Sequence, residues 1–336
     1  MMTSISRIDP RVWDELAAEP AAEGRVQRRI LPSIRHDVHV AEARPERLRM
    51  LIMSIDDSPP AIPQRSVGAK GLRGVIETAS HRVNITLSAA STAGNPLFAE
   101  LAADLSSVLY KHRDQQPAGA VLRRLASWKA FYARQAEPLS KEQAAGLFSE
   151  LEVLCEFLVP ATGSGPAVAA WHGPDPSVHD FEFPQLALEV KSFRGSGVGR
   201  MTISSEDQLD AAAPGELFLA YVRLDQRSAG PGATLADQVA KARNLVSDSF
   251  EESELLEDRL LQAGWRPSAE RLRTEVYMVK STELFAVREG FPRITRDILP
   301  TGIGNVRYHV DRGVLDPFLV SGEQLRRVLT GENHES

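Results

Sequence analysis

Two short segments near the middle of the chain, residues 180–183 and 186–191, alternate between polar and apolar side chains and are joined by Pro-Gln. Alternation at every residue predicts two half-buried β-strands. If they pair symmetrically about the Pro-Gln turn, Asp180 lies opposite Glu189, and Lys191 shares their face. Carboxylates placed directly opposite each other are destabilising. A divalent cation would offset that repulsion, so the hairpin constrains the chemistry as well as the fold.

The opposite face of this expected hairpin is apolar. Phe181 and Phe183 of the first segment, with Leu186, Leu188 and Val190 of the second, are expected to form a core layer. Proline disfavours a primed two-residue turn, so a wider loop is the alternative. A loop of odd length would shift the pairing and leave the parity within each strand intact.

A helix is expected upstream, over residues 140–158. Ser140 and Gln143 have the spacing of a capping box, and the leucines that follow form an apolar stripe. At about 100° of rotation per residue, Glu150 falls on the flank of that stripe. The helix can therefore bring a third carboxylate to the hairpin.

A helical Glu, a strand Asp and a strand Glu-x-Lys, in this order, resemble the PD-(D/E)XK nuclease superfamily over roughly residues 139–225. The surrounding sequence is similar to a bacterial family of PD-(D/E)XK motif proteins. The similar segments are residues 146–151, 171–174, 179–181, 189–192, 203–205 and 208–209. His179 stands where the motif has its proline, a degenerate position that does not bind metal.

The resemblance implies an α/β fold with a restriction-endonuclease-like core, a mixed central sheet flanked by helices, and a Mg²⁺- or Mn²⁺-dependent deoxyribonuclease. Asp180, Glu189 and the Val190 carbonyl would ligate the ion, and Glu150 would hold a second ion or orient a water. Lys191 would position the nucleophilic water and stabilise the transition state. The implied substrate contacts are Ser205 and Gln208, at the start of a following helix, with His172 and Arg194.

An isolated Glu-x-Lys pair on a strand is more often a solvated face with a cross-strand ion pair. The surrounding pattern favours the nuclease, and a non-catalytic scaffold or nucleic-acid-binding subunit is the alternative.

Members of the family are often encoded in phage-defence clusters beside helicases, ATPases and methyltransferases. The implied partners are therefore DNA and such proteins, while RNA as substrate and homo-oligomerisation stay open.

Charge is distributed unevenly along the 336 residues. The first 135 hold 19 Lys and Arg against 14 Asp and Glu, and the rest hold 20 against 31. The excess predicts a basic amino-terminal domain over residues 1–135 that contacts DNA or a partner, and a basic charge that only keeps the domain soluble is the alternative. Alternating segments at 36–42, 47–54 and 72–90 predict that this α+β domain is β-rich. A nuclease core over 136–250 and an α/β extension over 251–336 that packs on the core are expected to follow. The basic clusters are Arg25, Arg28, Arg29 and Arg35, and later Arg123, Arg124, Lys129 and Arg134.

The single cysteine, Cys155, excludes an intramolecular disulfide and fits a reducing compartment. The first residues lack the apolar core of a signal peptide, and no apolar run approaches the roughly 20 residues of a membrane span. A cytoplasmic protein without a membrane segment is expected.

Overall fold

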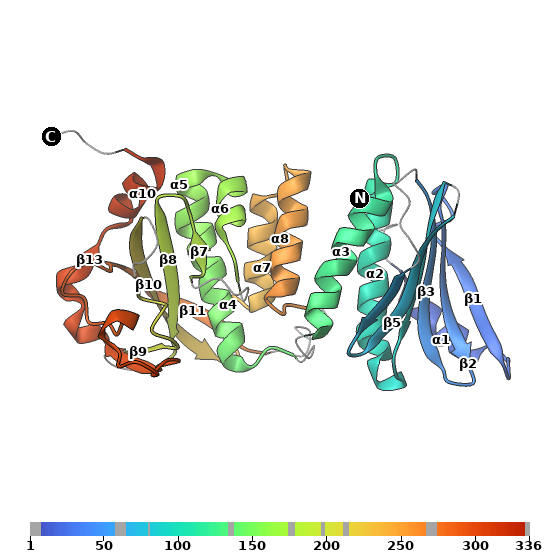
Figure 1. The fold of residues 1–336 in the computed structure, drawn as a ribbon, viewed down its shortest axis with the longest axis horizontal. Coiled ribbons are helices and arrows are strands. Elements are labelled where there is room, and N and C mark those ends of the chain that lie inside the picture. Colours follow the sequence, from blue (N-terminus) through green and yellow to red (C-terminus); the bar gives the residue numbers. More distant parts are fainter. Residues whose placement is uncertain are drawn as a thin grey trace. The chain divides into compact units, whose positions relative to one another are not determined.

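A computed structural model describes residues 8–57, 65–79, 81–133, 138–173, 179–195, 199–210, 215–266 and 274–332. The chain divides into two compact units, unit 1 (Met1–Glu137) and unit 2 (Pro138–Ser336), both drawn in Figure 1. None of the helices in the described ranges is long and apolar enough to cross a membrane.

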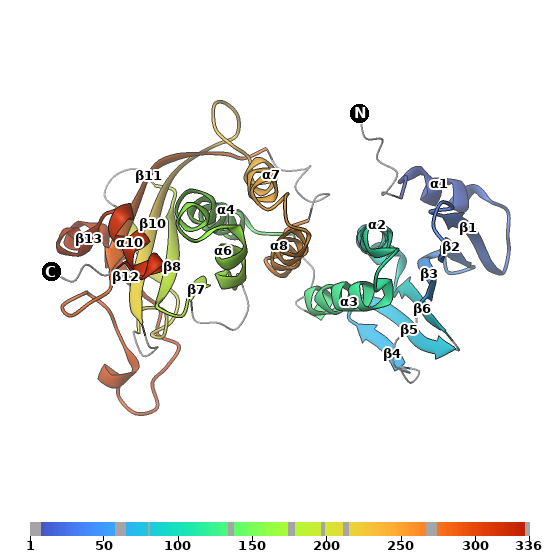
Figure 2. The same cartoon turned by 90° about the horizontal axis from the view of Figure 1, so that it is seen from above.

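Unit 1 is built on a six-stranded antiparallel sheet with the strand order β1-β2-β3-β6-β5-β4. Its elements are α1 (Arg11–Ala18), β1 (Gly24–Ile30), β2 (Asp37–Arg44), β3 (Leu48–Asp56), β4 (Arg65–Ala69), β5 (Leu72–Ala79), β6 (Arg82–Ala89), η1 (Thr92–Gly94), α2 (Asn95–His112) and α3 (Pro117–Ala133). Alternate residues of the central strands, such as Leu51 and Ile85, are fully buried. Helices α2 and α3 pack on the sheet, as Figure 2 shows. The period-2 burial explains why this part of the sequence is recognisable as β-rich.

Unit 2 holds a five-stranded mixed sheet in the order β13-β11-β10-β8-β7 and a two-stranded sheet of β9 and β12. The strands are β7 (Phe181–Glu182), β8 (Leu186–Phe193), β9 (Arg200–Ile203), β10 (Glu216–Arg227), β11 (Val276–Ala286), β12 (Tyr308–Asp311) and β13 (Leu319–Val320). The helices are α4 (Lys141–Val153), η2 (Leu154–Leu158), α5 (Val159–Thr162), α6 (Ser164–Ala170), α7 (Leu235–Leu245), α8 (Phe250–Gln262), η3 (Arg296–Ile298), η4 (Arg312–Val314), η5 (Asp316–Phe318) and α10 (Gly322–Thr330). β8 and β10 are parallel, and the other pairs are antiparallel. A mixed α/β fold with sheets flanked by helices is therefore confirmed.

The central sheet of unit 2 is covered on both faces. Leu188 and Phe218 pack into the core on the helical side, together with Phe148 of α4. Leu219 and its neighbours pack on the opposite side, with Ile203 of β9. Figure 1 shows α4, α6, α7 and α8 on one side of this sheet and β9 on the other. Burial on both faces explains the continuous apolar run in β10.

The expected helix begins as predicted and ends differently. Ser140 and Gln143 form the reciprocal capping box. Beyond Val153 the chain continues in the wider π-helical winding of η2, which leads into α5 and its Pro160. Proline has no N–H to donate to the preceding turn, and this loss accounts for the altered winding.

The three-part domain division stays a prediction. Residues 251–336 are not separate from the sheet, because β11 pairs with β10 over almost its whole length. The described fold accordingly groups residues 138–336 in one unit, and the boundary with unit 1 falls two residues beyond position 135.

Candidate functional site

The hairpin of β7 and β8 has the register expected from the sequence. Phe181 lies opposite Leu188, and Glu182 lies opposite Ala187. The N–H of Phe183 donates to the Leu186 carbonyl at 2.8 Å, so the proline does not shift the pairing. The symmetric hairpin is confirmed, and Asp180 is the residue directly before β7.

Asp180 is bound to the strand that carries the Glu-x-Lys sequence. Its carboxylate accepts the backbone N–H of Val190 at 2.7 Å, and its own carbonyl accepts the N–H of His172 at 3.0 Å. The N–H and C=O groups of one strand residue point toward the same neighbour. The carbonyl of Val190 therefore faces the side on which Asp180 lies.

Glu189 and Lys191 lie two residues apart on the face of β8 opposite α4. The Lys191 Nζ is 2.6 Å from Glu189 Oε1 and donates to Gln208 Oε1 at 3.0 Å. Glu189 is only 2% exposed, and its second oxygen, Oε2, has no hydrogen-bond partner among the described residues. A buried carboxylate oxygen without a donor is costly, and it is an open acceptor for a cation.

Glu150 reaches the same region from α4. Its Oε2 accepts the indole N–H of Trp171 at 2.9 Å. Trp171 is fully buried and forms an isolated β-bridge with Phe181, the first residue of β7. Trp171 therefore holds Glu150 where the short edge strand begins, beside Asp180.

The charges of these four side chains act on one another. Burial first, and then the charge of Asp180, raise the pKa of both Glu150 and Glu189 to about 8. Burial also raises the pKa of Asp180, while the Lys191 ammonium and the Val190 N–H lower it. Mutual shifts of this kind require that the groups share one poorly solvated region. Three carboxylates with a single ammonium leave that region short of positive charge.

In the described ranges, no three His, Cys, Asp or Glu side chains form a group that could hold a metal ion. The donor set fits a hard divalent cation all the same, since it offers carboxylate oxygens and a backbone carbonyl. The unpartnered Oε2 of Glu189 and the raised carboxylate pKa values mark where positive charge is lacking. Asp180, Glu189 and the Val190 carbonyl are the residues placed to hold such an ion, with Glu150 beside them.

Ser205 and Gln208 lie in a turn, so the prediction that they begin a helix is wrong. The N–H of Gln208 donates to the Ser205 carbonyl in a tight turn. The carboxylate of Glu206 accepts the N–H groups of Asn305 and Val306, which binds this turn to a late loop. Gln208 nevertheless contacts Lys191, and its Oε1 also accepts the Ser204 N–H at 2.8 Å.

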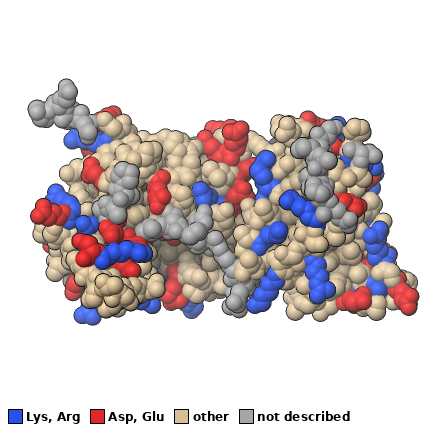
Figure 3. Space-filling view, viewed as in Figure 1, with Lys and Arg blue, Asp and Glu red and all other residues tan. Residues whose placement is uncertain are grey.

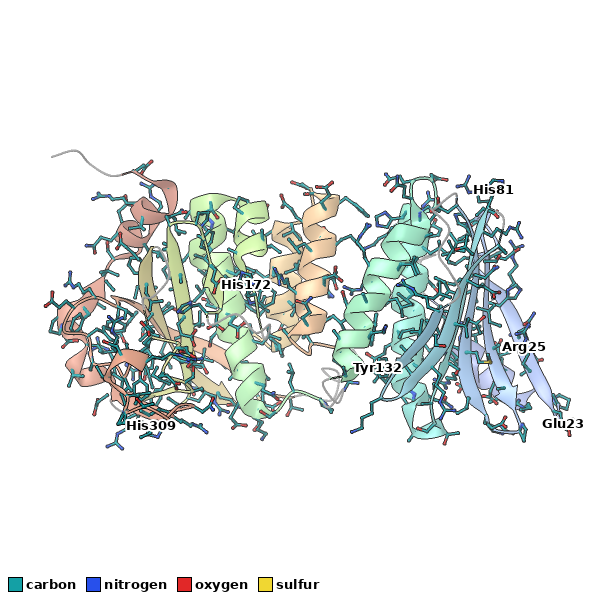
Figure 4. The ribbon with its side chains drawn as sticks, viewed as in Figure 1. Glu23, Arg25, His81, Tyr132, His172 and His309 are labelled. Atoms are coloured by element: carbon teal, nitrogen blue, oxygen red, sulfur yellow. The ribbon has the colours of Figure 1, made fainter. Side chains whose placement is uncertain are left out.

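The other two expected substrate contacts have their own partners. Arg194 donates to Gln226 Oε1 at 2.9 Å and to Glu142 Oε1 at 2.8 Å, so its guanidinium is directed to β10 and the start of α4. His172, labelled in Figure 4, has its Nε2 3.9 Å from Glu182 Oε2. The structure thus brings Gln208 to the carboxylates and holds Arg194 elsewhere.

Two neighbours of the site were not identified as such from the sequence. Trp171 donates its indole N–H to Glu150, and no local pattern in the sequence signals that bond. Tyr308 of β12 lies close enough to Lys191 for the ammonium to lower its pKa, although burial raises that pKa overall. Tyr308 is more than a hundred residues from the motif, and no local pattern signals that it lies near Lys191.

The family comparison covers most of the chain. A family model described as "Putative PD-(D/E)XK family member, (DUF4420)" matches residues 10–312, which include parts of both units. Comparison with curated proteins gives no significant match, and neither does comparison with solved structures.

Proposed function

Because the chain belongs to this PD-(D/E)XK family, a nuclease family, we propose that it is a metal-dependent DNA endonuclease that hydrolyses phosphodiester bonds. We further propose that it works in the cytoplasm as a subunit of a bacterial anti-phage defence or restriction system, with a helicase or ATPase and a methyltransferase as partners. The observation that carries the proposal is the set of contacts that holds Asp180 to Val190, Lys191 to Glu189, and Glu150 to Trp171 beside β7.

A bound Mg²⁺ or Mn²⁺ would acidify a water molecule and neutralise charge that develops on the scissile phosphate. Asp180 and Glu189 would hold the ion together with the Val190 carbonyl. The Asp180 carboxylate is already fixed in place by the Val190 N–H, so one ligand is oriented by the strand that supplies the others. This is the preorganisation that a metal site requires of its protein ligands.

Lys191 is the group suited to contact the phosphate. Its ammonium is shared between Glu189 and Gln208, and both contacts keep it on the face of the carboxylates. A compact ammonium can move from Glu189 to a phosphate oxygen or to the attacking water without leaving Gln208. It would then stabilise negative charge in the transition state.

Glu150 is suited to accept a proton. With its pKa raised to about 8, this carboxyl group exchanges protons near neutral pH, as a general base or acid must. The indole N–H of Trp171 fixes one oxygen and leaves the other for a water. Ser205 and His172 are proposed as contacts to the DNA backbone.

The proposal is tested by incubating the purified chain with DNA and Mg²⁺, alone and with the proteins encoded beside it, and by repeating this with Asp180→Ala and Lys191→Ala. Both variants should lose cleavage while remaining folded. Glu156→Gln is the matched control, because Glu156 lies in η2, directly after α4, and pairs with Lys241 away from the site. Equal phage protection by wild type and both variants would favour the non-catalytic scaffold instead.

A further inference from the structure

Several cations of unit 1 are neutralised within the unit. They include Arg28 and Arg29, two of the four residues of the first basic cluster seen in the sequence. The pairs are Arg11–Asp9, Arg28 with Glu15 and Glu19, Arg29–Asp37, Arg82–Asp56 and Arg124–Asp104. A cation that already pairs with a carboxylate adds little to the attraction for an external anion.

Other cations of unit 1 have no acidic partner among the described residues, and four of these lie on or directly beside two elements that pack together, α3 and β4. Arg65 and Lys70 lie at the two ends of β4, and Arg123 and Lys129 lie on α3. Arg65, Lys70 and Arg123 are exposed, and Lys129 is half-buried. We call these four residues the α3–β4 strip. Arg73 follows them on β5 and is also exposed.

Helix α3 lies alongside the edge strand β4. The start of the helix is fixed near the end of β3 by the Ala118 N–H, which donates to Asp57 at 3.0 Å. Near the other end of the helix, a Cβ on Gly71, in the β4–β5 turn, would lie 3.2 Å from the ring of Tyr132, a residue labelled in Figure 4. The cations therefore extend along one edge of the unit.

The length of the strip suits a repeating anion. Arg65 and Lys70 are about 17 Å apart along an extended strand, and Arg123 and Lys129 are about 9 Å apart along a helix. Duplex DNA presents a phosphate on each strand roughly every 3.4 Å of axis, so a strip of this length faces several phosphates.

The surface around the strip has few acidic or bulky side chains that would repel or obstruct a polyanion. Glu77 is the only Asp or Glu within α3, β4 and β5. Gly119, Ala126 and Ala130 on the exposed side of α3 are small, so a backbone can approach closely. Figure 3 shows Lys and Arg side chains over this part of unit 1 with few acidic ones among them.

We propose that the α3–β4 strip binds the phosphate backbone of duplex DNA, in addition to the candidate site in unit 2. An acidic protein is the other polyanion to consider. Protein interfaces are anchored by large apolar side chains, and all the exposed large hydrophobic residues of the described chain lie in unit 2. A surface of cations and small residues matches sequence-independent contact with phosphates.

The test measures duplex DNA binding by the full chain in EDTA, over a range of salt concentrations. The variant neutralises the strip with Arg65→Gln, Lys70→Gln, Arg123→Gln and Lys129→Gln. Each lost phosphate contact should reduce the slope of log affinity against log salt by roughly 0.9, so the slope should flatten by roughly 3 to 4. Affinity at low salt should fall at least tenfold.

The matched control removes the same number of charges from the same unit, with Arg11→Gln, Arg28→Gln, Arg29→Gln and Arg82→Gln, all of which are paired. Its slope should stay close to that of wild type, and thermal unfolding checks that both variants fold. Equal effects of the two variants would overturn the inference. Polyglutamate serves as the probe for an acidic protein. If the strip variant loses binding to polyglutamate and keeps its binding to DNA, the inference is also overturned, in favour of an acidic protein.

The binding measurement does not depend on the proposed cleavage, because EDTA removes the metal that cleavage requires. A chain that binds DNA through the strip and cuts nothing would refute the proposed function alone. A chain that cuts DNA and binds it equally well without the strip would refute this inference alone.

Discussion

The carboxylate of Asp180 accepts the backbone N–H of Val190 at 2.7 Å, which joins the residue directly before β7 to the middle residue of Glu-Val-Lys. One bond thereby fixes the spacing between the first acid of the motif and the strand that carries the other groups. β7 is only two residues long, so the ladder itself cannot hold Asp180 in place. The carboxylate does so, together with the Asp180 carbonyl that accepts the His172 N–H, and the metal-binding side of the site is ordered before any ion binds.

Asp180→Asn should abolish cleavage and raise stability. The Asn oxygen can still accept the Val190 N–H, while one of three crowded negative charges is removed. We expect a gain of about 1 kcal/mol, or roughly 2–4 °C in the melting temperature of unit 2 without metal. Asp180→Ala is the comparison, since it loses the acceptor as well and should be less stable than Asn. A melting temperature for Asp180→Asn below that of wild type would contradict this.

Without metal, unit 2 should become less stable as pH rises from about 6.5 to 8. Folding raises the pKa of Glu150 and Glu189 to about 8, so over this window the folded state binds more protons than the unfolded state. Stability is then fully present at low pH and declines toward the folded pKa. This pH window excludes the titration of His179. Burial lowers the pKa of His179, so at more acidic pH its titration makes stability rise with pH, which is the opposite trend.

Thermal unfolding at several pH values measures this slope. Mg²⁺ should flatten it, because an ion that binds the ionised carboxylates stabilises the protein most at pH 8. The double variant Glu150→Gln, Glu189→Gln should show little slope with or without Mg²⁺. A wild-type slope of the opposite sign would show that the two carboxyl groups are not crowded in solution.

Lys191→Met should lower kcat by about 10²- to 10³-fold with little change in DNA affinity, because its ammonium is expected to act on the transition state. Its charge also lowers the pKa of Glu150 and Glu189, so its removal should move the pH–rate profile to higher pH. Lys191→Arg should not restore the rate, since a planar guanidinium cannot replace a compact ammonium between Glu189 and Gln208. A rescued rate would show that charge alone is required.

Gln208 should act as a positioning residue for Lys191. Its Oε1 accepts both the Lys191 ammonium and the Ser204 N–H, so Gln208→Leu frees the ammonium from one of its two partners. We expect kcat to fall by about tenfold, with KM unchanged. Gln226→Leu is the control, because Gln226 pairs with Arg194 and should leave kcat as it is. A change confined to KM would instead place Gln208 in substrate binding.

The hairpin could be predicted because its determinants are local. Alternation in residues 180–183 and 186–191 specifies which side chains share a face, and the register follows from the short turn. The capping box of α4 is equally local, and so is the placement of Glu150 on the edge of the apolar stripe.

Contacts between distant segments could not be predicted in the same way. The turn that holds Gln208 was expected to begin a helix, but Glu206 binds it to Asn305 and Val306, about a hundred residues later. Trp171 and Tyr308 meet the motif only through tertiary packing. Arg194 is three residues beyond Lys191 in the sequence, and no local pattern there indicates that its partners lie on α4 and β10.

Diffraction from crystals soaked in Mn²⁺, with the anomalous signal of the metal, tests the central claim most directly. We expect an anomalous peak in contact with the carboxylates of Asp180 and Glu189, and no such peak in Asp180→Asn. A well-ordered wild-type crystal that shows no peak there, or that binds Mn²⁺ only elsewhere, would contradict the account.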